Sequence, residues 1–237
     1  MTPFRLNPEL DANALAAQFV RHGRLQIPNF LDMPSATQLH ALLSDREDWV
    51  QVINSGDRVF EASRSSRATM TDQQRDALDA AVYAGARRGF QFRYEAIRVP
   101  DGRDERRGSA DPLAALATFL SEGPARDLLR TVTGVEAIDF ADAQATAFGA
   151  GDFLTAHDDA VAGKRRHAAY VLGLTPQWRT EWGGLLLFHD DHVVSQGFVP
   201  SFNTLNLFSV PQRHSVSEVT RAASDRRYSV AGWLRSR

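Results

Sequence analysis

The 237-residue sequence predicts an α+β protein in which helices precede a β-sandwich or jelly roll. From about residue 135 onward, short strand-like segments follow one another with turn residues between them, which is typical of sandwiches and jelly rolls. Before that point helical patterns dominate, and helices followed by a run of strands indicate an α+β fold. We therefore expect one domain over residues 1–237. It has a helix-rich flanking and support region at 1–134 and the jelly-roll core at 135–237.

Helix signals recur through the first region. Leu15 and Phe19 stand at helical spacing, and Gly23 follows them as a stop signal. Thr71 is followed three residues later by Gln74, which is the sequence pattern of a capping box. Prolines stand near the first turns of the other helical segments, where their missing N–H is tolerated. The predicted helices cover residues 9–22, 34–44, 71–88, 111–121 and 124–133.

Extended segments alternate with these helices. Residues 89–100 have period two, so that Phe90, Phe92 and Tyr94 share one side of a predicted strand. The stretch 101–111 is charged, contains glycine and lacks periodicity, and we interpret it as a mobile loop. Other strands are expected at 25–30, 49–53, 58–61, 137–148, 151–156, 167–174, 183–189, 192–199, 203–209, 214–219 and 227–235.

Composition argues against several functional classes. A net charge of −2 argues against a broad nucleic-acid or anionic-membrane surface. The absence of cysteine excludes disulfides, thiolate metal sites and cysteine nucleophiles. No run approaches 18 uninterrupted apolar residues, and the N-terminus has no basic start followed by an apolar stretch. We therefore expect neither a membrane span nor a secretory signal, and we expect a cytoplasmic protein.

A candidate metal site is the most informative feature of the chain. His157 and Asp159 are two residues apart in an extended segment, so their side chains point to the same side and can grip one ion. His214 lies on a later strand, and four strand candidates between it and Asp159 are enough for the chain to cross the jelly roll and return. Two imidazoles and one carboxylate leave coordination positions open, as in non-haem Fe(II) oxygenases.

A rival pair, His189 and Asp191, has the same spacing. Only two strand candidates separate it from His214, and the segment resembles a hairpin tip, where acidic residues are usually solvated. Two further histidines, His167 and His192, lie between these motifs. A zinc hydrolase could use the same three ligands as the first set, so the metal stays open at this point.

Arg227 and Ser229 lie on the last predicted strand. Because they are two residues apart they share a face, whereas Arg226 points to the other side. A guanidinium beside a hydroxyl suits a bidentate carboxylate. An arginine inside an otherwise apolar run therefore indicates a site for a dicarboxylate co-substrate.

These motifs together resemble the Fe(II)/2-oxoglutarate-dependent dioxygenases, specifically the prolyl 4-hydroxylase-like branch. The resemblance covers about residues 140–235. It is carried by segments 144–148, 151–159, 181–188, 211–216 and 227–229, with Trp178 before the third of them. The family's fold is a double-stranded β-helix (a jelly roll) flanked by helices, which agrees with the order of elements predicted above.

The resemblance implies roles for the candidate residues. His157, Asp159 and His214 are then ligands of Fe(II), and Arg227 binds the distal carboxylate of 2-oxoglutarate. O2 is the second co-substrate, and ascorbate is the reductant that the family suggests.

Two positions depart from the family pattern. Many relatives carry tyrosines where this chain has Phe148 and Gly173, and both tyrosines tend to hydrogen-bond the co-substrate. By the resemblance, Ser229, or Tyr170 from a neighbouring position, is expected to supply a replacement hydroxyl.

Three functional hypotheses follow. The first is hydroxylation of a C–H bond of a prolyl residue or a proline-like compound, with decarboxylation of 2-oxoglutarate to succinate. The second is the same chemistry on a free amino acid, a peptide natural product or another small molecule. The third is a non-catalytic jelly-roll binding module. The expected partner is a peptide, protein or small-molecule substrate, with neither nucleic acid nor membrane, and the charged segments 63–67 and 101–111 are candidate lids.

Overall fold

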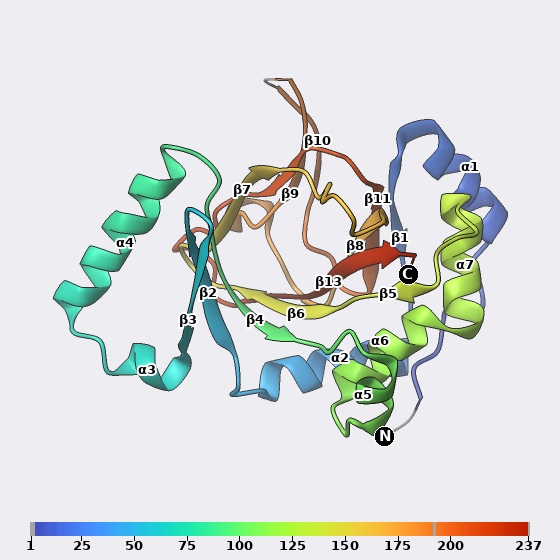
Figure 1. Cartoon of the computed structure of the whole chain (residues 1–237), viewed down its shortest axis with the longest axis horizontal. Helices are drawn as coiled ribbons and strands as arrows, with labels where there is room; N and C mark the ends of the chain where they lie inside the picture. Colours follow the sequence, from blue (N-terminus) through green and yellow to red (C-terminus); the bar gives the residue numbers. More distant parts are fainter. Residues whose placement is uncertain (1–2, 192, 237) are drawn as a thin grey trace.

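The computed structural model describes residues 3–191 and 193–236. Its centre is one strongly curled antiparallel sheet, and helices pack around the outside (Figure 1). Helices α1 (Ala12–His22) and α7 (Gly123–Thr133) lie at one side, α3 (Arg64–Ala68) and α4 (Asp72–Ala86) at the opposite side, and α2 (Met33–Asp45), α5 (Arg103–Gly108) and α6 (Pro112–Ser121) along a third. The jelly-roll fold with flanking helices is thereby confirmed. Within the described ranges, no helix is long and apolar enough to cross a membrane.

The sheet joins strands from both halves of the chain. Its strands are β1 (Arg24–Pro28), β2 (Val50–Ser55), β3 (Arg58–Ser63), β4 (Phe92–Arg98), β5 (Phe140–Ala141), β6 (Gln144–Phe148), β7 (Phe153–His157), β8 (Arg166–Gly173), β9 (Leu186–Asp190), β10 (Val193–Phe198), β11 (Thr204–Ser209), β12 (His214–Val216) and β13 (Arg227–Arg235). They pair in the order β1-β11-β8-β13-β6-β4-β7-β12-β9-β10, with β2 and β3 as a hairpin beside β4 and β5 paired with β13. β4 comes from the first half of the chain, yet it lies between β6 and β7.

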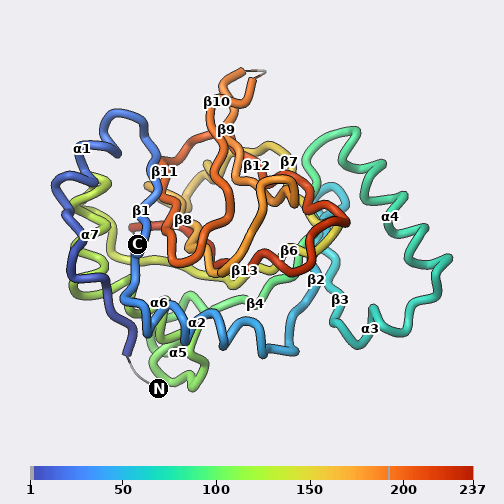
Figure 2. Tube along the Cα trace, turned by 180° about the vertical axis from the view of Figure 1, so that it is seen from behind, coloured from blue at the N-terminus to red at the C-terminus, as the bar shows by residue number. Residues whose placement is uncertain are grey.

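The two faces of the curled sheet have different roles. Side chains on the outer face, such as Leu172, Val230 and Leu234, pack with apolar side chains of α6 and α7 in the main core. Burying each such side chain stabilises the fold by about 1.5–3 kcal/mol, so the helices hold the sheet in its curl. The inner faces of β4, β6, β8 and β13 instead line a cavity. Seen from behind, α3 and α4 stand clear of the main core and beside β2 and β3 (Figure 2).

Local signals in the sequence account for the helix ends. Gly23 adopts φ +63° and ends α1, a left-handed conformation that glycine adopts without steric cost. At the start of α4 the capping box forms as expected. The backbone N–H of Gln74 donates to Thr71 Oγ1 at 3.2 Å, and the backbone N–H of Thr71 donates to Gln74 Oε1 at 2.8 Å.

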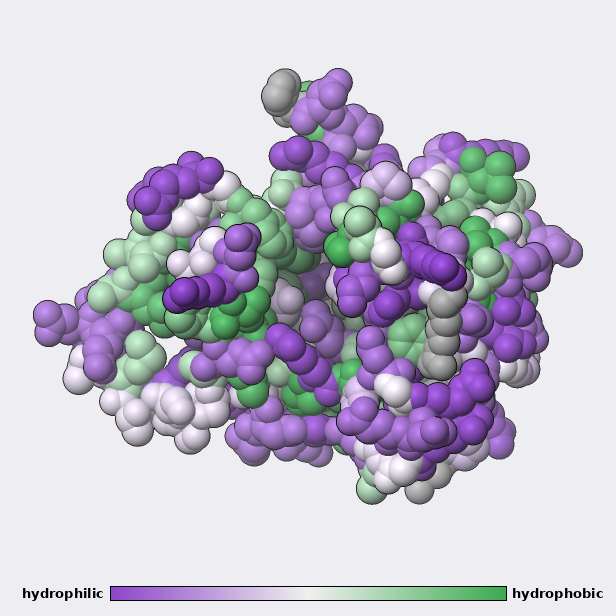
Figure 3. Space-filling model, viewed as in Figure 1, coloured by the Kyte–Doolittle hydropathy of each residue, from purple (hydrophilic) through white to green (hydrophobic). Residues whose placement is uncertain are grey.

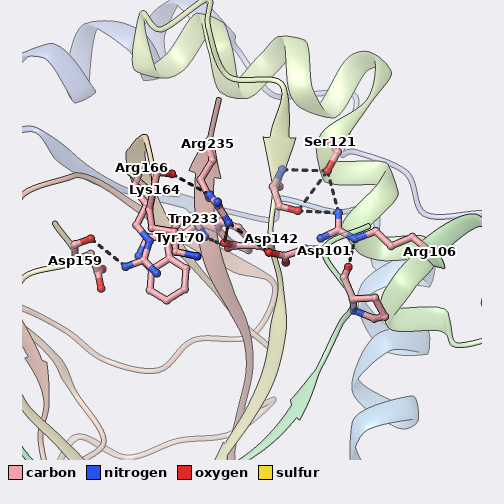
Figure 4. Close-up of polar contacts among 12 residues, drawn as sticks. Asp101, Arg106, Ser121, Asp142, Asp159, Lys164, Arg166, Tyr170, Trp233 and Arg235 are labelled. Atoms are coloured by element: carbon pink, nitrogen blue, oxygen red, sulfur yellow. Dashed lines mark hydrogen bonds and ion pairs between the residues drawn. The ribbon is translucent and has the colours of Figure 1, made fainter. Parts of the chain in front are cut away.

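The prediction of a mobile loop at 101–111 is wrong. Residues Arg103–Gly108 form α5, and the side chain of Arg106 is buried. Its guanidinium donates to the carbonyl oxygens of Pro100 and Ala141 and lies 3.4 Å from Ser121 Oγ (Figure 4). A buried charge needs such partners, and two of them lie far away in the sequence. The local charge pattern therefore could not reveal that this segment is fixed to the sheet.

Candidate metal centre

A cavity of about 460 Å³ lies inside the curled sheet. Its walls come from β4, β6, β7, β8, β12 and β13, and its lining includes His157, Asp159, His214, Arg227 and Ser229. Polar and apolar patches alternate over the face of the molecule shown in Figure 3, and this face is hollowed near its centre. A cavity of this size, mostly apolar with a few converging polar groups, is typical of a small-molecule site.

The sheet register brings the two histidines together. His157 ends β7 and His214 begins β12, and the two residues are direct antiparallel partners. Asp159 follows β7 by two residues. Its Oδ1 lies 3.6 Å from Nε2 of His157, and its Oδ2 lies 3.5 Å from Nε2 of His214. Among the described residues, these three form the only cluster of His, Asp or Glu side chains whose ligand atoms all lie within 4.8 Å of one another.

The geometry and protonation of this set fit a divalent metal ion. Ligand atoms held about 2.0–2.2 Å from one ion stand roughly 3–3.5 Å apart, close to the observed spacing. Each ring is oriented through its other nitrogen. Nδ1 of His157 lies 3.0 Å from the carbonyl oxygen of Thr155, and Nδ1 of His214 lies 2.8 Å from that of Gln212. Such bonds fix the tautomer that leaves Nε2 free to bind a metal.

Burial and charge favour the ligating protonation states. Burial alone would raise the pKa of the Asp159 carboxyl, but the adjacent imidazoles of His157 and His214 hold that pKa below its usual value. Burial lowers the pKa of His214. The site therefore favours a carboxylate and a neutral imidazole, which are the forms that bind metal ions.

Arg227 contributes a buried charge without a counter-ion. The residue is 4% exposed, and burial lowers the pKa of its guanidinium to about 10. Its Nε has no hydrogen-bond partner within the described part of the chain, and no carboxylate there forms an ion pair with it. The guanidinium carbon lies 5.2 Å from the centre of the Phe148 ring. An unpaired buried cation is costly, so this end of the cavity is suited to an anionic ligand.

Hydroxyl groups line the cavity beside Arg227. Ser229 Oγ and Thr146 Oγ1 lie 2.7 Å apart on the paired strands β13 and β6. Whichever hydroxyl donates in this bond, the proton of the other is left for a ligand. Tyr94 stacks on Phe148 with ring centres 4.9 Å apart, and Gln144 Nε2 lies 3.4 Å from its hydroxyl oxygen. The Tyr94 O–H has no acceptor among the described residues.

The predicted contribution of Tyr170 does not fit its placement. Tyr170 borders the cavity, but its side chain packs in the main core and its hydroxyl donates to the carbonyl oxygen of Asp142 at 2.7 Å. Its only donor is thus already used. Tyr94 was not predicted as a site residue, although it was placed correctly on one side of a strand with Phe92. Only the pairing of β4 with β6 brings Tyr94 to the cavity.

The two positions without the family tyrosines differ in the space around them. Phe148 occupies the position beside Arg227 with its ring in the cavity. At Gly173 the backbone of Ser201 lies so close that an added Cβ would stand 2.3 Å from its carbonyl oxygen. A tyrosine cannot fit there without displacing that backbone.

Sequence reasoning also missed Arg166. Its guanidinium lies 3.5 Å from the centre of the Trp233 ring, and its Nη1 donates to the carbonyl oxygen of Asp159 at 3.0 Å (Figure 4). Both residues line the cavity. The run of basic residues at 164–166 indicates only surface charge. Trp233, in contrast, is six residues after Arg227 on the same predicted strand, so strand alternation places both side chains on the cavity side.

Of the described histidines, His189 and His167 lie apart from the ligand set. His189 Nε2 is 2.8 Å from Ser215 Oγ, and its rival partner Asp191 is exposed at a turn. His167 Nε2 is 3.0 Å from Ser236 Oγ. His192 lies outside the described residues. The arginines of segment 63–67 do not line the metal cavity. They point to the reverse face of β4, so a lid role over the metal is not supported for this segment.

Comparisons with known proteins agree with this geometry. Residues 143–235 match the 2OG-Fe(II) oxygenase superfamily. The chain is 29% identical to prolyl 3-hydroxylase OGFOD1 of Mus musculus over 154 residues, 61% of this chain and 28% of that protein. It is 34% identical to the Xenopus laevis protein of the same name over 117 residues, 46% of this chain and 22% of that protein. The matched part therefore spans about a quarter of these relatives. A Pseudomonas putida prolyl-4-hydroxylase shares the fold with a TM-score of 0.59 and 19% identity, over 96% of this chain and 100% of that one.

Proposed function

Because residues 143–235 match the 2OG-Fe(II) oxygenase superfamily, we propose that the chain is an Fe(II)- and 2-oxoglutarate-dependent dioxygenase. We propose that it hydroxylates a C–H bond of a prolyl residue or a proline-like compound, with decarboxylation of 2-oxoglutarate to succinate. The observation that carries this proposal is the pairing, within one cavity, of a His-Asp-His set with a buried arginine that has no counter-ion. A zinc hydrolase would not need that arginine, and a non-catalytic binding module would not need the His-Asp-His set.

In this proposal the three ligands hold the metal and leave its other positions open. Bound Fe(II) would supply the activation of O2, with 2-oxoglutarate as the source of two electrons. His157 and His214 keep their Nε2 atoms aimed at the ion through their Nδ1 bonds to backbone carbonyls. Asp159 adds a negative charge that favours a divalent ion over a neutral occupant.

Arg227 would bind the distal carboxylate of the co-substrate. Its guanidinium can form two parallel N–H···O bonds with a carboxylate, a geometry that a point charge does not offer. The hydroxyl pair of Ser229 and Thr146 has one unused donor, and the O–H of Tyr94 is another. We propose that these hydroxyls take the place of the family tyrosines at Phe148 and Gly173.

The lining near the metal supports an apolar cyclic substrate. Phe90 is 49% exposed, and its ring centre lies 5.3 Å from that of His157. Val161 is 48% exposed, and it lines the same cavity together with Phe92 and Trp233. Aromatic and aliphatic surfaces of this kind suit a pyrrolidine ring better than a charged amino acid side chain. This agrees with the prolyl hydroxylase names of the relatives.

The test is turnover under controlled oxygen. Purified protein is loaded with Fe(II) anaerobically, mixed with 2-oxoglutarate and a panel of proline-containing peptides, and then exposed to O2. We expect succinate and a peptide mass increase of one oxygen atom. Production of succinate only with free amino acids would reassign the substrate class. Failure to form succinate with any substrate, in a protein that binds iron, would refute the dioxygenase proposal.

The proposal extends to the reductant and the compartment. Ascorbate would keep the iron ferrous, so turnover should fall over repeated cycles without it and recover on its addition. A cytoplasmic location is expected from the lack of cysteine, since such a chain needs no oxidising compartment. Microscopy of the tagged protein checks the location.

A further inference from the structure

A second cleft lies on the reverse face of the strand that lines the metal cavity. Phe92 and Tyr94 of β4 point into the cavity, and the residues between and after them, Arg93 and Glu95, point to the other side. This alternation is the normal period of a strand. The cleft has a volume of about 680 Å³, which lies in the range of small-ligand sites. It is walled by α3, α4, the turn at 149–152 and the loop that precedes β13.

Arginines dominate this cleft. The lining includes six of them, contributed by three separate regions of the chain: Arg64, Arg67, Arg75, Arg93, Arg221 and Arg226. They face four carboxylates, of which Asp79, Asp152 and Glu218 line the cleft and Glu95 lies beneath it. Outside the lining, Glu47 and Asp72 also pair with Arg64 and Arg75. The six arginines and these six carboxylates balance in number, so what the cleft offers an anion is its guanidinium N–H groups that lack a partner.

Glu95 gathers three of these arginines at one point. Its side chain is fully buried, and it pairs with Arg64 at 2.9 Å, with Arg226 at 3.1 Å and closely with Arg67. One carboxylate cannot neutralise three guanidiniums. Its effect is to fix their positions. Arg64 is engaged at all three of its nitrogens, by Glu95 and by the carbonyl oxygen of Arg46, whereas Arg67 and Arg226 each contact Glu95 through one nitrogen and keep other N–H groups available. Side chains that are already ordered lose less entropy on binding a ligand.

Several donors in the cleft have no partner. Arg67 Nε is buried and lacks a hydrogen-bond acceptor in the described residues. Arg221 forms no hydrogen bond or ion pair within those residues. Arg75 is half-exposed: its Nε lies 3.4 Å from Asp72 Oδ1 and its Nη1 donates to the carbonyl oxygen of Arg67 at 3.2 Å, which leaves its Nη2 without a partner among the described residues. By contrast, both Asp79 and Asp152 are paired with Arg93, and Glu218 accepts a hydrogen bond from Tyr83.

We propose that this cleft is a second ligand site, which binds a small oxyanion carrying at least two negative charges, such as a diphosphate or a polycarboxylate. Planar guanidiniums match the oxygen pairs of phosphate and carboxylate groups. The fixed set around Glu95 supplies one group of donors, and Arg75 and Arg221 supply another across the cleft. A ligand with two charged groups can use both.

This site is separate from the metal cavity. Arg226, the last residue before β13, and Arg227, its first residue, line different pockets, the cleft and the cavity respectively. Gly149 and Phe148 divide in the same way on the strand beside them. An oxyanion could therefore bind at either arginine, and the experiment must distinguish the two places.

The test is calorimetric titration of the full chain with pyrophosphate and, separately, with citrate. We expect the parent protein to bind at least one of these anions. Arg75→Gln and Arg221→Gln should each weaken that binding about tenfold, as expected for the loss of one charge-assisted hydrogen bond. Neither arginine contacts Glu95, so neither change leaves a buried charge unpaired. Arg227→Met and the surface change Arg21→Gln should leave the affinity unchanged. Preference for pyrophosphate or for citrate identifies the group that the cleft selects.

Other outcomes overturn the proposal. If Arg227→Met abolishes binding while Arg75→Gln and Arg221→Gln have no effect, the anion occupies the metal cavity and the cleft is not a site. If neither probe binds at physiological ionic strength, the arginines serve only to tie α3 and α4 to the sheet. Circular dichroism of each variant shows whether it is folded, and the Arg75→Gln and Arg221→Gln double variant should keep the melting temperature of the parent.

Discussion

His157 and His214 are direct partners across the antiparallel pair β7–β12, and their ring centres lie 4.3 Å apart. The sheet register therefore places two imidazoles side by side, although 56 residues separate them in the sequence. Each ring is turned by a backbone carbonyl two residues before it, at Thr155 and at Gln212. The same local geometry on both strands aims both Nε2 atoms at Asp159.

Metal binding should depend on these three side chains and not on their neighbours. We expect His157→Ala or His214→Ala to weaken binding of Fe(II), or of Co(II) as a stable substitute, by at least about 100-fold, since one of three protein ligands is lost. The matched controls are Asp158→Asn, which changes the exposed residue between two ligands, and His189→Ala, which removes the rival histidine. Equal loss of metal in His189→Ala would place the metal elsewhere.

Arg227→Met should have opposite effects on stability and on co-substrate binding. Without co-substrate, replacing an unpaired buried cation by an apolar chain should stabilise the fold by about 1–3 kcal/mol. Affinity for 2-oxoglutarate should fall about 100-fold, because a charge-assisted bidentate contact is lost. Urea unfolding and equilibrium titration measure the two effects.

Its neighbour Arg226 provides the control, because Arg226 is paired with the buried carboxylate of Glu95. Arg226→Met should destabilise the fold and leave the affinity for 2-oxoglutarate unchanged. A loss of stability in Arg227→Met would contradict the absence of a counter-ion at that residue.

Tyr94→Phe tests the replacement hydroxyl. The change should raise the KM for 2-oxoglutarate about tenfold, as for one lost hydrogen bond to a charged group. Stability should change little, because the hydroxyl has only one long contact, from Gln144. Tyr83→Phe is the control, since the hydroxyl of Tyr83 donates to Glu218 on the other face of the sheet. An unchanged KM in Tyr94→Phe would leave the Thr146–Ser229 pair as the source of the hydrogen bond.

The metal set could be predicted from the sequence because its signals are local. Strand parity orients Arg227 with Ser229, the two-residue spacing of His157 and Asp159 at the end of β7 pairs these ligands, and the number of intervening strands selects His214. The structure places all five side chains around one cavity. Parity does not reveal which strand lies beside which, and for that reason Tyr94 was missed and Tyr170 was chosen instead. The neighbours of a strand are set by the fold of the whole chain.

Long-range contacts also explain the misjudged charged segments. Segments 63–67 and 101–111 have the composition of solvated loops, and both are helical in the structure. Arg64 and Arg67 are fixed by Glu95, and Arg106 by carbonyl groups of residues 100 and 141. Composition does not show that an arginine has a buried partner 28 or more residues away.

The jelly-roll core should not fold without the first half of the chain, and we propose that residues 1–237 are a single domain. A fragment of residues 135–237 lacks β4, which pairs with both β6 and β7, and β1, which pairs with β11. Removing β4 leaves two sheet edges in the middle of the sheet, and unpaired backbone groups there are costly. We expect this fragment to be aggregated or unfolded by circular dichroism, while the full chain unfolds in one cooperative transition. A folded, metal-binding fragment would contradict a single domain.

Asp152 should give the protein a distinctive dependence on pH. Burial raises the pKa of its carboxyl from an ordinary value of 3.8 to about 6, although the backbone N–H of Gly149 and the charge of Arg93 act in the opposite direction. At a pH between these two pKa values, the Asp152 carboxyl keeps its proton in the folded state but has released it in the unfolded state. The contribution of this group to stability is therefore complete below about pH 4 and is lost as the pH rises through 6.

Asp152→Asn removes this ionisation while its amide oxygen can still accept the hydrogen bond from Gly149. Relative to the parent, the variant should gain about 2–3 kcal/mol of unfolding free energy between pH 4 and pH 7.5. Urea unfolding at both pH values, in buffers without phosphate or citrate, measures the difference, and Asp158→Asn serves as the exposed control. Asp159 and Glu95 have lowered pKa values, so their protonation at low pH destabilises the parent and the variant equally. Their effects on the free energy of unfolding therefore cancel in the comparison. A difference that stays constant across this range would show that Asp152 is already ionised in the folded protein at pH 4.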